Sequence, residues 1–565
     1  MSPAVILPLL LCLAICLVPL ALLRNRDAKS RQESLVSPGY IPPEAIRNAS
    51  IAYSIRLVAL WPAIMLGGDG NFLGAAFVAL GLGLGIYLLY HLRGRIFPFL
   101  EQSLSRDESV TVHAFIAQSC GGEPRVRVVA ASLTLFVLAA VIACEAVLLY
   151  IYFAFVFESD LVARALTFGA LLLAALHAFS AGHPGVIYSG QLQLGAIFLG
   201  LISTAALLLY QHVSALTPLP SNGYFGIGLA AFLCLAIIVY RRSRYIETGA
   251  IDRNSRSARL LSKFGKLLNP VISVFAVLVI VLAGMDLVGG QTASQPVTDA
   301  TRFPVAVWPA LALMLVFYPL VDVVQWQRLA AVEVNREAYR GDHARWLNSL
   351  RGIFRIYAAD ITVLWLLAAA LGTITVAALA PTGNPEIISF FVSEGMSGAN
   401  PIVTVAFSLL LMTVAAVALS TMAASFSGGL YTLRYDILGS RFAGSSKLGR
   451  LFFLATFLAL IAATELLPRG LTLVEFLAAV FALGLALVSP ILAFVPLILG
   501  PVLTGRRVDP AFALAILAAG AVSTLVGLVA FFAIGEIAWL GSAAPLALGL
   551  GVALYAAGAY GKRMR

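Results

Sequence analysis

The stretch "AAVALSTMAASFSGGLYTLRYDIL", residues 415–438, begins as an unbroken apolar run of membrane-helix character, yet it carries two adjacent hydroxyls. Ser420 and Thr421 lie within the run, small residues surround them, and Asp436 follows sixteen residues after Ser420. A hydroxyl in a membrane helix usually bonds back to the carbonyl one turn earlier, or packs among small residues at a helix contact. Either explanation accounts for Ser420 or Thr421 alone.

The hydroxyl pair, taken together with the small residues around it, favours a third explanation, which is a sodium site. Na⁺ takes several oxygen ligands and needs little bulk around them. The two hydroxyls, Val417 one turn earlier, and backbone carbonyls from a neighbouring interrupted helix would supply those ligands. Ser420, Thr421 and Val417 are therefore candidate sodium-site residues.

Composition places the whole chain in a membrane. Of 565 residues, 61% are hydrophobic and 11% are charged, and the mean hydropathy is +0.95. These values are typical of a multi-pass membrane protein. The net charge of +10 does not indicate nucleic-acid binding, because Lys and Arg recur in alternate loops instead of forming one basic face. The five cysteines show no metal-ligand spacing, and we expect them to be small buried hydrophobic residues.

Membrane spans need about 20 apolar residues each. By this measure the chain is an all-α integral membrane protein of about fifteen transmembrane helices. The predicted segments lie near 3–23, 50–68, 71–92, 127–157, 161–179, 185–210, 223–241, 268–289, 304–325, 353–380, 401–434, 449–467, 471–503, 510–534 and 540–560.

Loop charges predict the topology. No positive charge precedes the segment 3–23 and no small-residue cleavage site follows it, so we expect a retained helix with the N-terminus outside. Threading the chain from there puts nearly all basic loops on one side, which makes the C-terminus cytoplasmic. The organisation predicts the inner (plasma) membrane of a bacterium.

Enzymatic chemistry has no obvious place in this sequence. The loops are some tens of residues at most, too short for a catalytic domain. The chain carries no phosphate-binding glycine loop, no HExxH and no GxSxG in a plausible setting. We therefore expect no catalytic residues, no metal centre and no cofactor beyond a coupling Na⁺ or H⁺. The expected partners are a small solute and the lipid bilayer, with no nucleic acid.

Two segments resemble signatures of the sodium:solute symporter family. "LSTMAASFSGGLYTLRYDIL", residues 419–438, resembles its Ser-Ser or Ser-Thr pair followed by an aspartate at the same interval. "VDVVQWQRLAAVEVNREAYRG", residues 321–341, resembles a second family motif. Residues 110–135 and 177–202 resemble two further family segments more weakly. The positions that fall on the second motif are Asp322, Gln327, Arg328, Ala330 and Ala331.

The resemblance implies a core of two inverted repeats of five helices each, in which the first helix of each repeat is interrupted at mid-membrane. Pro62 and the glycine pair 67–68 would disturb one such helix, and Pro309 and Pro319 the other. Two inserted helices would form a peripheral hairpin or a docking surface for a membrane partner. The expected division is 1–49, N-terminal helix and linker; 50–210, first repeat; 211–303, inserted hairpin; 304–505, second repeat; and 506–565, C-terminal helix pair.

The sequence departs from the family where sodium would bind. The family's fifth-helix aspartate falls on Gly190, so a carboxylate that attracts the cation is missing. In the first core helix, Leu57 and Leu60 align with the residues that donate backbone oxygens to sodium. Arg56 lies beside them and has no counterpart in the family pattern.

An arginine at mid-membrane costs about 2.5–3.5 kcal/mol by insertion scales, unless it is paired or hydrated. Arg56 is thirteen residues from Asp69 at the outer end of its helix, and Glu145 is thirteen residues from Glu158 at the end of another. The matching depths predict an Arg56–Glu145 ion pair. The alternatives are that Arg56 snorkels to the inner face, because Arg47 is nine residues away, and that Glu145 bonds to a neighbouring helix.

Two roles for Arg56 follow. It would act as a fixed cation in place of sodium, or it would bind the carboxylate of an anionic solute. Tyr318 and Gln325 flank the predicted break of the sixth core helix and are further candidate solute contacts. The sequence thus predicts a secondary active transporter of a small carboxylate or amino acid, coupled to sodium or protons. The alternative is a transporter-like solute sensor or assembly subunit that has lost sodium coupling.

Overall fold

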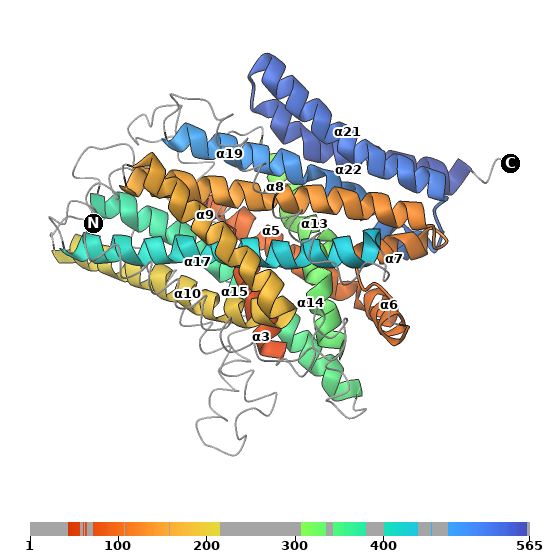
Figure 1. The fold of residues 1–565 in the computed structure, drawn as a ribbon, viewed down its shortest axis with the longest axis horizontal. Coiled ribbons are helices and arrows are strands. Elements are labelled where there is room, and N and C mark those ends of the chain that lie inside the picture. Colours follow the sequence, from red (N-terminus) through yellow and green to blue (C-terminus); the bar gives the residue numbers. More distant parts are fainter. Residues whose placement is uncertain are drawn as a thin grey trace.

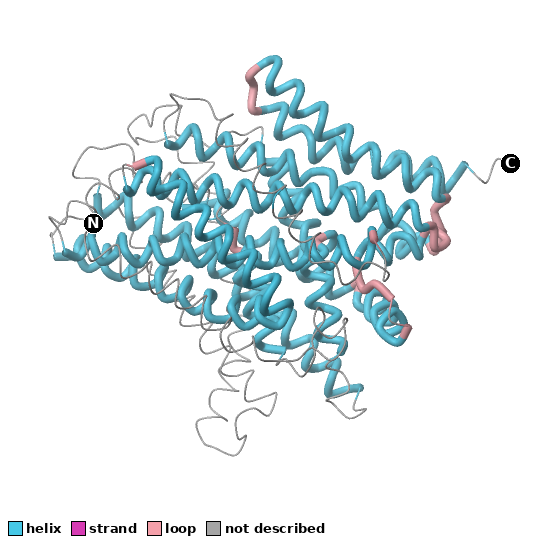
Figure 2. Tube along the Cα trace, in the orientation of Figure 1, coloured by secondary structure: helices cyan, strands magenta, loops and turns pink. Residues whose placement is uncertain are grey.

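Helices make up the part of the chain that the structure describes. The computed structural model describes residues 43–56, 60, 63–64, 72–106, 108–157, 159–214, 307–334, 343–379, 401–438, 454 and 473–561. Figure 2 shows helices and a few short loops within these segments, with no strand among them. Nine helical segments within these ranges are long and apolar enough to cross a membrane. The predicted segments 3–23, 223–241 and 268–289, and all of 449–467 except Leu454, lie outside the described residues.

The first half of the described chain contains seven α-helices. The longest, α8, has 34 residues. A π-helical turn, His177–Ala181, leads from α9 to α10 and ends at Gly182, whose φ of 61° favours glycine. The helices are α3 (Pro43–Ser54), α5 (Phe72–His91), α6 (Arg93–Ser105), α7 (Val112–Ser119), α8 (Pro124–Phe157), α9 (Asp160–Leu176) and α10 (Gly182–Ser214).

The second half contains eight α-helices. A π-helical turn, Leu433–Ile437, extends α17, and a 3₁₀ turn, Ser489–Ala493, joins α19 to α20. The helices are α13 (Trp308–Val321), α14 (Val323–Val334), α15 (His343–Leu379), α17 (Pro401–Thr432), α19 (Leu473–Val488), α20 (Phe494–Thr504), α21 (Pro510–Ile534) and α22 (Ala538–Gly561).

Burial separates central helices from peripheral ones. In the most apolar stretch of α17, 89% of the residues are buried inside the protein. In the corresponding stretches of α21 and α22, 39% of the residues are buried. Figure 1 shows α10 and α17 running alongside each other, and α21 and α22 paired at one edge of the bundle. Leu525, Val529 and Phe532 of α21 are exposed, as expected for a lipid-facing helix. The other helices therefore surround α17, which lies at the centre of the bundle.

Candidate functional site

Two helix interruptions face each other in the middle of the bundle. The first follows α3: the helix ends at Ser54, and Ile55 and Arg56 leave its regular geometry. The second separates α13 from α14 at Asp322, whose φ of −79° and ψ of 114° are those of extended backbone. The sequence predicted an interruption in each of these helices. The first break comes before Pro62, which lies outside the described residues.

Local chemistry stabilises the break at Asp322. Pro319 cannot donate a helical hydrogen bond, so α13 is weakened just before it ends. The Asp322 carboxylate then caps α14 by accepting the Val324 N–H at 3.0 Å, as an N-terminal aspartate does. The indole of Trp326 donates to the Leu320 carbonyl at 2.8 Å and satisfies a backbone group near the interruption.

Arg56 and Asp322 join the two interruptions. The Nη2 of Arg56 lies 3.8 Å from Oδ2 of Asp322, and the two side chains are 13% and 1% exposed. Arg56 also donates to the hydroxyl of Tyr53 at 2.9 Å. Its guanidinium carbon lies 4.1 Å from the ring centroid of Tyr318, a cation–π distance. The charge of Arg56 is therefore paired with a carboxylate, and the Tyr53 hydroxyl and the Tyr318 ring make further favourable contacts with the guanidinium.

The predicted Arg56–Glu145 ion pair is wrong, because the structure pairs Arg56 with Asp322. Glu145 is buried on α8, but it does not line the cavity around Arg56. Equal depth along two helices does not determine which helix faces which. The interruption after α3 brings Arg56 to the interruption between α13 and α14, and Asp322 lies there.

A second hydrogen-bond network connects three helices beside this pair. Gln325 of α14 donates through Nε2 to the hydroxyl of Tyr357 at 2.8 Å. The Ser54 hydroxyl is 2.6 Å from that same oxygen, and Tyr357 in turn donates to the Ser50 carbonyl at 3.1 Å. Tyr357, on α15, holds the end of α3 against the start of α14. Tyr357 was not predicted, since nothing in its sequence neighbourhood distinguishes it from an ordinary core tyrosine.

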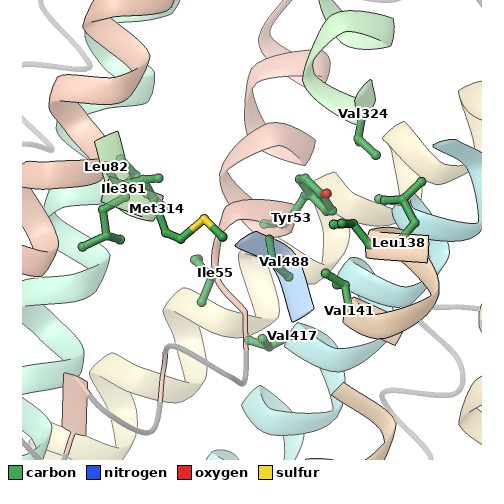
Figure 3. Packing of buried hydrophobic residues seen from close by; sticks show 14 of the residues in the cluster. Tyr53, Ile55, Leu82, Leu138, Val141, Met314, Val324, Ile361, Val417 and Val488 are labelled. Atoms are coloured by element: carbon green, nitrogen blue, oxygen red, sulfur yellow. The ribbon is translucent and has the colours of Figure 1, made fainter. Parts of the chain in front are cut away.

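A cavity of about 90 Å³ lies against this polar cluster. A water needs roughly 10–15 Å³ of such volume, so there is room for a small solute or several waters. Arg56, Tyr318 and Gln325, three of the predicted solute contacts, all line it. Figure 3 shows Met314, another lining residue, beside the end of α3. The remaining lining residues are Tyr53, Ser54, Leu82, Leu311, Leu315, Pro319, Asp322, Trp365, Phe481, Gly484, Leu485 and Val488.

The candidate sodium residues lie on α17 and beside the first interruption. Ser420, Thr421 and Val417 are buried, and α17 packs against α3. The Thr421 hydroxyl has no hydrogen-bond partner among the described residues, so its oxygen is available to a ligand. Leu60 is buried and its N–H donates to the Arg56 carbonyl at 2.7 Å, whereas Leu57 lies outside the described ranges. The sodium site therefore stays a prediction.

Close helix packing at Gly190 leaves no room for the carboxylate that the family pattern has there. A Cβ at Gly190 would lie 3.0 Å from the Cβ of Ala49 and 3.1 Å from its Cα. The backbones of α10 and α3 therefore meet at this point, and an acidic side chain would push them apart. Glycine at position 190, in place of a residue with a carboxylate, therefore allows α10 to pack closely against α3, the first interrupted helix.

Gly190→Ala is expected to destabilise the protein by about 1–3 kcal/mol, because the added methyl overpacks the contact with Ala49. Gly195→Ala, on the same helix, is the matched control, since no atom lies within 4 Å of its Cβ position. We expect that variant to be neutral or slightly stabilising. Thermal midpoints in detergent measure both, and equal midpoints would contradict the packing argument.

Asp436 of the predicted signature lies in a different buried network. Its Oδ1 accepts hydrogen bonds from Ser109 at 2.7 Å and Thr111 at 2.9 Å, and its Oδ2 is 2.9 Å from Nδ1 of His113. The other ring nitrogen of His113 is 2.7 Å from the hydroxyl of Thr134 on α8. These contacts fasten the end of α17 to α7 and α8. The spacing pointed to Asp436, but its partners were not predicted.

Comparisons with known proteins identify the fold. No known family and no curated protein matches the chain. Among solved structures, the chain is similar to a Na⁺-coupled sialic acid symporter described in its substrate-bound outward-open state, with a novel Na⁺ site. The likeness covers 100% of this chain and 98% of that one, with a TM-score of 0.57 and 13% sequence identity. At this identity the two proteins share a fold.

Proposed function

We propose that this chain is a secondary active transporter that moves a small organic solute across a membrane by alternating access. The observation that carries the proposal is the cavity at the junction of the two helix interruptions, where Arg56 and Asp322 meet. Solute and ion sites of repeat-built transporters form at such discontinuous helices. The fold shared with a Na⁺-coupled symporter supports the same conclusion.

The solute that fits this site is a small carboxylate or amino acid. The Arg56 guanidinium faces the cavity and has donors suited to a carboxylate. Tyr318 and Gln325 add a hydroxyl and an amide to the lining, and the rest of the wall is largely apolar. A small organic group with one charged end matches that division.

Two features of the site bear on the identity of the coupling ion, and they favour different ions. Arg56 puts a fixed positive charge beside the first interruption, which favours transport without sodium or coupling to protons. The unpartnered hydroxyl of Thr421, as far as the described residues go, favours a surviving sodium site. We retain both Na⁺ and H⁺ as candidates. The bacterial inner membrane, with the N-terminus outside and the C-terminus cytoplasmic, remains part of the proposal.

Uptake into proteoliposomes tests the proposal. We expect at least one solute from a radiolabelled panel of small carboxylates and amino acids to accumulate above the level in empty liposomes. Parallel reactions with an inward sodium gradient, an inward proton gradient and no gradient identify the coupling. Arg56→Gln should reduce uptake about tenfold or more, since it loses a charge-assisted hydrogen bond. Ser420→Ala/Thr421→Ala should remove any dependence on sodium.

The matched control is Arg125→Gln, because that arginine is 85% exposed and pairs only loosely with Glu123 at 4.0 Å. Its uptake should equal that of the wild type. Binding of a panel solute without uptake under any gradient would instead support the second candidate, a solute sensor or assembly subunit. The close packing at Gly190, which excludes the sodium-attracting carboxylate, is the observation that favours this alternative.

A further inference from the structure

The wall of the cavity carries one positive and one negative side chain. Arg56 and Asp322 both line it, and Nη2 of the arginine lies 3.8 Å from Oδ2 of the aspartate. The other described residues of the lining are uncharged. Arg328 is near, with its guanidinium carbon 4.9 Å from the ring centroid of Tyr53, but it does not line the cavity. A ligand in the cavity therefore meets one cation and one anion.

Asp322 has a carboxylate oxygen that the described part of the protein does not use as a hydrogen-bond acceptor. Oδ1 accepts the Val324 N–H at 3.0 Å, whereas Oδ2 is buried and has no hydrogen-bond partner among the described residues. Nη2 of Arg56, at 3.8 Å, is farther away than the about 2.7–2.9 Å of a charge-assisted hydrogen bond. A buried carboxylate oxygen ordinarily accepts from a donor, and a ligand in the cavity would supply one.

The distance of 3.8 Å between Nη2 and Oδ2 suits the charged end of an α-amino acid. In that zwitterion the ammonium nitrogen and the nearer carboxylate oxygen are about 2.7 Å apart by standard covalent dimensions. With the ammonium about 2.8 Å from Oδ2 and the carboxylate oxygen about 2.8 Å from Nη2, the four atoms close a ring of alternating charge. Each charge of the ligand then lies beside its opposite.

The remaining lining offers a further acceptor and a largely apolar wall. Gln325 donates through Nε2 to the Tyr357 hydroxyl at 2.8 Å, which leaves its amide oxygen as a second acceptor for an ammonium group. Met314, Trp365 and Phe481 belong to the apolar part of the wall. A charged ligand side chain would find no counter-ion there, so the wall favours an apolar side chain.

The size of the cavity limits the length of that side chain. Its volume of about 90 Å³ corresponds to about six to nine waters, at roughly 10–15 Å³ for each. A ligand with a similar number of non-hydrogen atoms fits, which is the size of a small aliphatic amino acid.

We propose that the transported solute is an α-amino acid with a small apolar side chain, whose carboxylate binds Arg56 and whose ammonium group binds Asp322. Asp322 is then a specificity-determining residue. An anion without an ammonium group would place a second negative charge beside Oδ2, and the two like charges would repel. This inference rests on the proposed transport function and selects one of the two solute classes that the function includes.

Three ligands that differ by one charged group test the inference on the purified full-length protein. They are L-valine, 3-methylbutanoate, which lacks the ammonium group, and 2-methylpropylamine, which lacks the carboxylate. Each is titrated at constant ionic strength while the thermal midpoint is measured. L-valine should raise the midpoint, because it binds the folded protein. Each analogue should bind at least about tenfold more weakly, since it loses a charge-assisted hydrogen bond. L-lysine should give no shift, because its side chain would bury an unpaired ammonium group.

Asp322→Asn should change the preference among these ligands. The variant keeps the shape of the side chain and removes its charge, so L-valine should lose about tenfold in affinity or more. 3-Methylbutanoate should bind the variant at least as tightly as it binds the wild type. Asp160→Asn, in the exposed Asp160–Arg164 pair, is the control and should leave all affinities unchanged. If Asp322→Asn does not fold, the comparison of the three ligands on the wild type decides.

Two results on the wild type would overturn the inference and leave the proposed function in place. If 3-methylbutanoate binds as tightly as L-valine, Asp322 does not recognise the ammonium group, and the solute is a simple carboxylate. If 2-methylpropylamine binds as tightly as L-valine, Arg56 does not recognise the carboxylate.

Uptake into proteoliposomes separates the inference from the proposed function. If none of these ligands moves the midpoint but another solute of the panel is taken up, the inference fails and transport stands. If the ligands bind in the predicted order but L-valine is not taken up under any gradient, the zwitterion site is supported and transport fails.

Discussion

Asp322→Ala is expected to abolish solute uptake and to lower the free energy of unfolding by about 3–5 kcal/mol, the usual cost of removing one partner of a buried ion pair. The substitution leaves the guanidinium of Arg56 without its carboxylate at a position that is 13% exposed. It also removes the cap of α14, which contributes about 1 kcal/mol. Uptake assays and thermal unfolding in detergent measure the two effects.

A charge-neutral double variant separates the pair's structural role from its functional one. Arg56→Gln/Asp322→Asn removes both charges and should recover most of the stability lost in Asp322→Ala, but no uptake. Asp160→Ala, in the exposed Asp160–Arg164 pair, is the surface control and should change neither quantity noticeably. If the double variant is as unstable as the sum of its single variants, Arg56 and Asp322 are not coupled.

Asp436→Ala is expected to destabilise the protein by about 3–5 kcal/mol, because it leaves buried hydrogen-bond groups without an acceptor. The carboxylate accepts from Ser109 and Thr111 and contacts the ring of His113. These residues lie before and within α7, so their release should also loosen that helix from the end of α17. Thermal unfolding gives the size of the loss, and hydrogen exchange of residues 108–119 reports its location.

Asp509→Ala is the matched control for Asp436→Ala. Asp509 caps α21 by accepting the Ala511 N–H at 3.0 Å, at an exposed site. Its replacement should cost about 1 kcal/mol, the value of a helix cap. A loss at Asp436 no larger than this would mean that the network does not hold α17 to α7.

The long apolar helices were predictable, because a membrane imposes a length of about 20 residues on each span. The segment 510–534 was predicted with the bounds that α21 has. The helices α6 and α7 were missed, since they have only 13 and 8 residues and carry polar groups in a predicted basic loop. The start of α15 at His343 was predicted at 353 for the same reason: its first turns are too polar to be read as a span.

The site was predicted in part. Arg56 stood out because a charge inside an apolar run needs a partner. Pro309 and Pro319 indicated that the helix containing them is interrupted. The partner was chosen wrongly, since helix depth is readable from sequence and helix facing is not. Asp322 was assigned to the family motif in residues 321–341, but it was not predicted to pair with Arg56. The roles of Tyr53 and Tyr357 depend on contacts between distant segments, which one sequence does not reveal.

Accessibility of the cavity from both sides of the membrane tests the central claim most directly. The measurement places a cysteine at Met314, which lines the cavity, in a protein with the other four of its five native cysteines replaced and Cys120 kept. Keeping the native Cys120 provides an internal reference, because burial raises the pKa of its thiol to about 12 and slows its reaction at neutral pH. A membrane-impermeant thiol reagent is applied to right-side-out and to inside-out vesicles, with and without a transported solute.

Alternating access predicts that the introduced cysteine reacts from either side, and that bound solute slows both reactions. Reaction from one side alone, unaffected by any solute that the protein carries or binds, would contradict the account, because the cavity would then be a fixed crevice and not the site around which the helices move.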